Sequence, residues 1–89
     1  MNTEERVRDF LVEESSWDRP REELTDELPL IENRVLDSMA LLRLVAWLES
    51  EFGVEITDAE VVPSNFGSIE RIGQFVDSKL AAPGGQGRV

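Results

Sequence analysis

Residues 35–53 read VLDSMALLRLVAWLESEFG, and this stretch decides the fold of the chain. An aspartate and a serine precede a strongly apolar run of helical period, and a glycine follows the run. Aspartate and serine are preferred helix N-caps, and glycine is preferred at the left-handed position after a helix. The pattern therefore predicts a helix from Ser38 to Gly53, with Asp37 or Ser38 as its N-cap.

The two sides of this helix differ in their predicted environment. At about 100° per residue, four apolar residues recur on one side and are expected to lie in the core. They are Leu41, Val45, Leu48 and Phe52, with Leu44 widening the stripe and Trp47 on its flank. The opposite side carries Met39, Leu42, Arg43, Ala46 and Glu49. That side is unusually apolar for a surface in contact with solvent.

A first helix is predicted from Thr3 to Glu14, with Asn2 or Thr3 as its cap. Its helically spaced residues are Val7, Phe10, Leu11 and Glu14. The segment from Ser15 to Val35 contains two prolines and six acids and is predicted to be a long loop. Loops of this length are usually functional or held in place by apolar anchors. The candidate anchors are Trp17, Leu24, Leu28, Leu30 and Ile31.

After Gly53 the chain is expected to continue as a short extended link in which Ile56 fills a gap in the core. Thr57 or Asp58 then caps a short helical turn to about Val62, which Pro63 should stop. Phe66 is a further core residue, and Ser68 caps a last helix that runs to about Leu80. The apolar stripe of that helix is Ile69, Ile72, Phe75, Val76 and Leu80.

These elements predict an all-α fold with three main helices, one short helix and a long first loop. No segment has the pattern of a strand, and no internal repeat is present. We expect residues 1–80 to form the domain and residues 81–89, with one proline and three glycines, to form a disordered tail. A chain of 89 residues makes at most one domain.

Charge and composition exclude several functions. The net charge is −10, which argues against nucleic acid and anionic membranes as partners, since both need a basic face. The sequence has no histidine, cysteine or tyrosine, so a Ser-His-Asp or Cys-His site cannot be built from it. A carboxylate pair would need a cleft that so small a chain can hardly enclose. We therefore expect no catalytic residues, no metal site and no enzymatic activity.

The first ten residues are acidic and do not resemble a secretory signal. The longest apolar stretch is too short and too interrupted to span a bilayer. We expect a cytoplasmic monomer.

The segments PLIENRVLDSMALLRLVAWLESEFGVEIT (29–57) and VVPSNFGSIERIGQFV (61–76) resemble the acyl and peptidyl carrier protein family. The resemblance covers roughly Thr3 to Leu80. Its core is the tripeptide Asp37-Ser38-Met39, which opens a helix that ends in Glu-Phe-Gly. The tripeptide alone has little value, but its place between this loop and this helix is specific. The resemblance implies a stand-alone four-helix carrier.

In such carriers a phosphopantetheinyl transferase uses coenzyme A to attach a 4'-phosphopantetheine arm to the serine, which here is Ser38. The positive end of the helix dipole favours the resulting phosphodiester, and the arm supplies the thiol that the chain lacks. Asp37 has two open roles: it can cap the helix, or it can support the motif by helping to bind the transferase or its metal. Ser38 itself could instead be only a helix cap.

The resemblance also gives the apolar outer side of the helix a role, since carrier proteins dock partner enzymes there. The candidate docking residues are Met39, Leu42, Arg43 and Ala46. Scattered surface exposure is the alternative. Trp47 is expected to pack in the core and Trp17 to fold the long loop back onto the bundle.

Fatty-acid carriers place several acids near the serine, where this chain has Ala40 and Arg43. Asp-Ser-Met is familiar from D-alanyl and some aminoacyl carriers. These departures favour a carrier of acyl or aminoacyl groups in a polyketide or nonribosomal peptide type of pathway. Its expected partners are a loading ligase and downstream synthase or tailoring enzymes. The alternatives are a fatty-acid or D-alanyl carrier, and a small acidic helical interaction domain in which Ser38 is only a cap.

Overall fold

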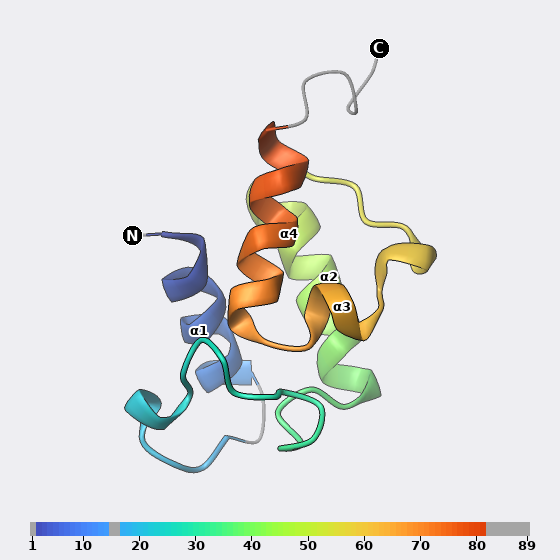
Figure 1. The fold of residues 1–89 in the computed structure, drawn as a ribbon. Helices are drawn as coiled ribbons and strands as arrows, with labels where there is room; N and C mark the ends of the chain where they lie inside the picture. The colour runs from blue at the N-terminus through green and yellow to red at the C-terminus, as the bar shows by residue number, and fades with distance from the viewer. Residues whose placement is uncertain (1, 15–16, 82–89) are drawn as a thin grey trace.

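The computed structural model describes residues 2–14 and 17–81, and these form an all-α fold without any strand (Figure 1). The four α-helices are α1 (Thr3–Glu14), α2 (Ser38–Phe52), α3 (Pro63–Phe66) and α4 (Ile69–Ala81). Two short 3-10 turns lie in the connections, η1 (Arg21–Glu23) and η2 (Asp58–Glu60). The predicted fold class is confirmed.

Helix α1 has the predicted bounds and lies along α4. The side chain of Asn2 caps it by accepting a 2.8 Å hydrogen bond from the N–H of Glu5. Val7 and Leu11 are fully buried. The two helices approach closely at Gly73, where a Cβ would lie only 2.5 Å from a carboxylate oxygen of Glu4.

Helix α2 begins at Ser38 as predicted, and Asp37 is its N-cap. The Oδ1 atom of Asp37 accepts a 2.9 Å hydrogen bond from the N–H of Ala40. Gly53 ends the helix with a φ of 68°, the left-handed conformation that glycine adopts without strain.

The most deeply buried residues of α2 differ in part from those predicted. Leu44 and Leu48 are fully buried. The other members of the predicted stripe are only half-buried, namely Leu41, Val45 and Phe52. The prediction placed Leu44 at the edge of the buried stripe, whereas Leu44 lies at its centre. The reason is that α1 and α4 both pack against α2, and Leu44 faces the space that they enclose.

The aromatic residues of α1 and α2 form one cluster. Trp47 stacks on Phe10 with ring centroids 4.7 Å apart and meets Phe52 edge-on at 5.8 Å. The predicted core packing of Trp47 is confirmed. Trp17 is half-buried against the core, and its Nε1 donates to the carbonyl of Pro20, so it folds the loop back as predicted.

The link after Gly53 differs from the prediction at Pro63. The 3-10 turn already ends at Glu60, and Pro63 is the first residue of α3 rather than a stop signal. Proline suits this position because the first N–H of a helix has no intrahelical partner. Val54 is buried, whereas Ile56 is only half-buried against the core. The predicted short helical turn is therefore present as η2, with Thr57 at its N-cap position, and α3 is an additional helix that was not predicted.

Side chains on η2 hold this link in place. Glu60 accepts a hydrogen bond from the N–H of Thr57 and pairs with Lys79 of α4 at 2.7 Å. The bond to Lys79 is the main reason that the pKa of Glu60 lies below its ordinary value.

The last helix is capped as predicted, because the Oγ of Ser68 accepts a hydrogen bond from the N–H of Arg71. Ile69, Ile72 and Val76 are fully buried, and so is Phe66 just before the helix. Leu80 was predicted in the core but is 52% exposed on the last turn of α4. Helix α4 includes Ala81, and the remaining predicted tail lies outside the described residues.

The long first loop passes beneath the bundle and leads to the start of α2 (Figure 1). Leu24 and Leu30 anchor it as predicted, since both are fully buried. Two backbone hydrogen bonds tie it to the other elements, from Leu30 N–H to the Gly67 carbonyl and from Glu70 N–H to the Asp26 carbonyl. Ile31 was predicted to be an anchor, but it is 45% exposed because the chain turns outward there.

A buried arginine of α1 also holds this loop. Arg8 donates from Nε to the carbonyl of Leu24 at 2.8 Å and pairs with Glu5 and Asp26. Arg21 of η1 reaches back to Glu5 and Asp9. Its hydrogen bond to Glu5 is the main cause of the lowered pKa of Glu5, and of its own raised pKa.

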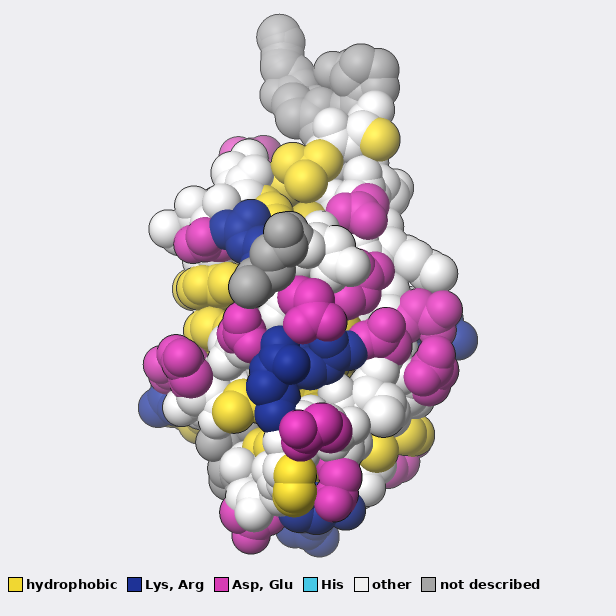
Figure 2. All heavy atoms as spheres, turned by 90° about the vertical axis from the view of Figure 1, so that its left-hand side faces the viewer, with side chains coloured by type: hydrophobic (Ala, Val, Ile, Leu, Met, Phe, Trp, Pro, Cys, Tyr) yellow, Lys and Arg dark blue, Asp and Glu magenta, His cyan; other side chains and the backbone are white. Residues whose placement is uncertain are grey.

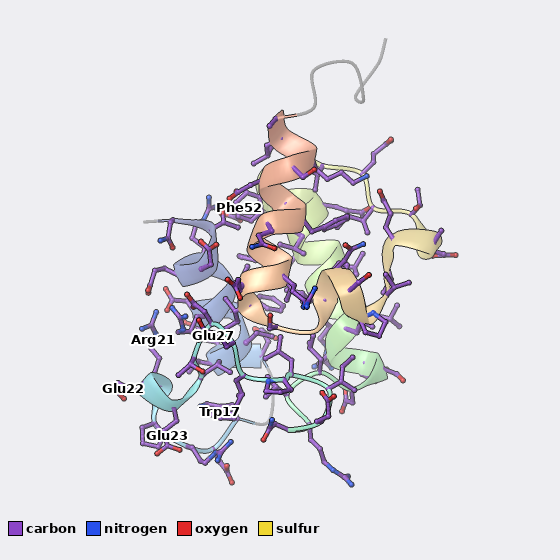
Figure 3. The ribbon with its side chains drawn as sticks, viewed as in Figure 1. Trp17, Arg21, Glu22, Glu23, Glu27 and Phe52 are labelled. Carbon is purple, nitrogen blue, oxygen red and sulfur yellow. The ribbon has the colours of Figure 1, made fainter. Side chains whose placement is uncertain are left out.

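The same network is visible on the surface. Figure 2 shows basic side chains at the centre of the face formed by α1 and η1, ringed by carboxylates. Figure 3 shows Arg21 beside α1, while Glu22 and Glu23 project away from the bundle. The loop is thus fixed to α1 by charges as well as by its buried leucines.

We predict that Arg8→Ala lowers the free energy of unfolding by about 2–3 kcal/mol. The substitution leaves the buried Leu24 carbonyl without its donor and Asp26 without its cation. Urea denaturation followed by circular dichroism measures the loss. Arg43→Ala is the control, since this exposed arginine should change stability by less than about 0.5 kcal/mol. Equal effects of the two substitutions would contradict the role given to Arg8.

Candidate functional site

Ser38 is exposed at the N-terminus of α2. Within the described part of the chain, its hydroxyl makes no hydrogen bond. The backbone N–H groups of Ser38 and Met39 also have no partner there, because Asp37 satisfies only the N–H of Ala40. The helix therefore presents one hydroxyl and two free N–H donors at the same end.

A surface hollow of about 780 Å³ lies next to this serine. Its lining residues come from the end of the long loop and the first turn of α2, and they are Ile31, Glu32, Arg34, Leu36, Asp37, Ser38 and Leu41. Both apolar and charged residues line the hollow. It gives a group attached to the hydroxyl a surface against which to lie.

A hydrogen-bonded turn fixes the backbone just before Asp37. The N–H of Val35 donates to the carbonyl of Leu30 at 2.8 Å, and the N–H of Arg34 donates to that of Ile31 at 3.1 Å. These two bonds are the pair that defines a Schellman motif, and the buried contact expected between its ends is supplied by Leu30 and Val35. Arg34 occupies the left-handed position of the motif, with a φ of 60°.

The turn was not predicted from the sequence. The left-handed position of a Schellman motif usually holds glycine or asparagine, and here Asn33 precedes it by one residue. Arg34 was not singled out either, although it lines the hollow together with Ser38. No local signal in the sequence marks Arg34 as the left-handed residue of this turn.

The predicted docking residues share one exposed surface of α2. Met39 is 61% exposed and Leu42 is 67% exposed, and Arg43 and Ala46 are exposed beside them. Glu49 was assigned to the same side but is half-buried, and its carboxylate accepts from the N–H of Ile56. The predicted exposure of the four docking residues is confirmed, and we call them the α2 surface.

The arrangement supports attachment chemistry. Within residues 2–14 and 17–81, no group of three or more acidic side chains is placed to hold a metal ion. No helix in this part of the chain is long and apolar enough to cross a membrane. A hydroxyl at a helix N-terminus can carry a phosphate ester, because the free N–H groups and the helix dipole favour its negative charge.

An all-helical domain with a free serine at the start of its second main helix is the architecture of a carrier protein. The family model described as "Phosphopantetheine attachment site" matches residues 6–76. The match takes in most of the chain, and the chain therefore belongs to this family of phosphopantetheine-bearing carrier proteins. Members of the family carry a covalently attached 4'-phosphopantetheine group and interact with phosphopantetheinyl transferases and partner enzymes.

The residues around Ser38 fit this group. The hydroxyl is free for esterification, the N–H groups of Ser38 and Met39 are available to a phosphodiester, and the hollow adjoins them. When bound, the group supplies a terminal thiol, which a chain without cysteine does not have.

Substitutions at Asp37 separate its two open roles. We predict that Asp37→Ala lowers the free energy of unfolding by about 1 kcal/mol, because the N–H of Ala40 loses its acceptor. Asp37→Asn should stay near wild-type stability, since asparagine caps helices as well as aspartate does. Thermal denaturation measures both effects. A destabilised Asp37→Asn variant would contradict the capping geometry.

The loading rate of the same Asp37→Asn protein then addresses the second role. A rate equal to that of the wild type means that the carboxylate serves only as a cap. A slow rate in a stable protein means that its charge contributes to the transferase reaction.

Proposed function

We propose that this protein carries an acyl or aminoacyl group as a thioester on a 4'-phosphopantetheine arm attached to Ser38. The single observation that supports Ser38 is its free hydroxyl at the open N-terminus of α2. The carrier presents its cargo to other enzymes and performs no catalysis itself. We further propose that the carrier domain takes in residues 1–80 and works as a cytoplasmic monomer.

The loading step depends on an external enzyme. With no histidine or cysteine in the sequence, the chain has no neutral-pH base to activate the Ser38 hydroxyl. The transferase must therefore remove the hydroxyl proton and bind coenzyme A. The chain contributes the nucleophilic oxygen, and its two free N–H groups at the helix terminus favour the phosphodiester that forms.

The rival interpretation, in which Ser38 is only a helix cap, has weaker support. Asp37 accepts the N–H of Ala40, which is the bond that a cap makes. Ser38 is the first residue of the helix and makes no such bond in the described structure. A small acidic helical interaction domain would have no need of a free serine at this place.

The nature of the α2 surface supports a natural-product pathway of the polyketide or nonribosomal peptide type. Two large apolar side chains, Met39 and Leu42, dominate it, and Arg43 is its only charged member. A partner that recognises this surface needs apolar contacts more than a row of cations. A fatty-acid or D-alanyl carrier is the alternative within the family.

Cargo identity can be tested with the holo protein. It would be incubated with ATP, single amino acids or fatty acids, and purified adenylating enzymes from natural-product and fatty-acid pathways. Intact-mass spectrometry then reports which acyl group is bound. We expect an amino acid or an unusual carboxylic acid to be loaded. Loading of ordinary fatty acids alone would contradict the pathway proposal and leave the carrier proposal standing.

We also predict that Met39→Glu and Leu42→Glu slow loading or acyl transfer by about tenfold or more, since an apolar docking residue commonly contributes 1–2 kcal/mol. Both proteins should keep wild-type stability because both side chains are exposed. Rates of phosphopantetheine loading and acyl transfer, with melting curves, measure the two effects. Ser50→Glu, on an exposed residue outside the α2 surface, is the matched control. Unimpaired rates in both variants would contradict docking there.

A further inference from the structure

The arginines of this chain divide into two groups. Five of the described arginines have a partner. Four of them form ion pairs with carboxylates, namely Arg6, Arg8, Arg19 and Arg21. The fifth, Arg71, donates a hydrogen bond to the Ser64 carbonyl. Arg34 and Arg43 are the two exceptions within residues 2–14 and 17–81. These two arginines thus have neither a carboxylate nor a carbonyl partner among the described residues, on a protein with a net charge of −10.

Arg34 is also unusual in its backbone. Its φ of 60° is in the left-handed region, where a side chain other than glycine costs about 1–2 kcal/mol. No other described residue except Gly53 has a positive φ. Strain of this kind persists where the surrounding structure imposes it, and it concentrates at functional sites. Glycine or asparagine would form the same turn at lower cost.

The place of Arg34 indicates what its side chain could bind. It lines the hollow beside Ser38, four residues before the serine, whereas Arg43 lies on the α2 surface and does not line this hollow. Glu32 and Asp37 also line the hollow. Asp37 is engaged with the N–H of Ala40, and Glu32 makes no ion pair with Arg34 in the described structure. The guanidinium therefore remains available.

We propose that Arg34 binds the phosphodiester that joins the arm to Ser38. Guanidinium groups match phosphate oxygens in geometry and charge, and Arg34 would add a cation to the two free N–H donors of α2. Its contact would hold the first atoms of the arm against the hollow, so Arg34 is a positioning residue. The proposal rests on the proposed attachment to Ser38.

The test compares apo and holo protein for wild type, Arg34→Asn and Arg43→Gln. Asparagine tolerates the left-handed conformation and carries no charge, so the turn is kept. Chemical denaturation at low salt gives a folding equilibrium constant for each form. Conversion to holo should raise this constant about two- to fivefold more in wild type than in Arg34→Asn, the range for an exposed charge pair. Arg43→Gln should match the wild type, and high salt should remove the difference.

A spectroscopic readout tests the contact independently of stability. In ¹⁵N-labelled protein, the Arg34 Nε–Hε signal should shift between apo and holo forms, while that of Arg43 should stay in place. The ³¹P signal of holo Arg34→Asn should differ from that of holo wild type, and Arg34→Lys should restore part of the effect.

The two proposals fail in different ways. If the wild type gains no phosphopantetheine, attachment to Ser38 is wrong. If it gains one but the Arg34 signal does not move and the stability changes are equal, the phosphodiester contact alone is wrong. An equal shift of the Arg34 and Arg43 signals would also overturn it, because a general charge effect would then explain both.

Discussion

The start of α2 depends on a loop that must satisfy its own buried backbone groups without regular secondary structure. Buried N–H and carbonyl groups need partners, and an unpaired one costs about as much as a lost hydrogen bond. Here the Leu24 carbonyl accepts a hydrogen bond from the guanidinium of Arg8. The Asp26 carbonyl accepts one from the N–H of Glu70, and the N–H of Leu30 donates to the Gly67 carbonyl. These bonds connect the loop to α1, to α4 and to the end of α3. The first turn of α2 is consequently held in a fixed place relative to the core.

This arrangement separates the stable and the functional parts of the molecule. The core is made of leucine, isoleucine, valine and phenylalanine side chains, and in residues 2–14 and 17–81 the ionisable groups other than Arg8 lie outside it. The candidate site is built at the margin, from an exposed serine, two free N–H groups and a hollow. The proposed attachment point therefore lies outside the core.

The sequence predicted the elements whose signals are local. The bounds of α1, α2 and α4 follow from helical period and from caps at Asn2, Asp37 and Ser68. It failed at Pro63, which begins α3 instead of stopping the preceding turn, and at Leu80, which is half exposed instead of buried.

The candidate site was also predicted in part from the sequence. The exposed serine and the apolar α2 surface follow from the period of one helix. The partners of Arg8 and the conformation of Arg34 could not be read from the sequence. Arg8 acts on residues 16 and 18 positions away, and the left-handed turn at Arg34 uses a residue that gives no local signal for it.

Intact-mass spectrometry can show whether phosphopantetheine is attached to Ser38. The folded wild type and Ser38→Ala would each be incubated with coenzyme A and a broad-specificity phosphopantetheinyl transferase. We expect a gain of one phosphopantetheine on the wild type, with fragment ions that place it at residue 38, and no gain on Ser38→Ala. A folded wild type that gains nothing, or a Ser38→Ala protein that is still modified, would contradict it.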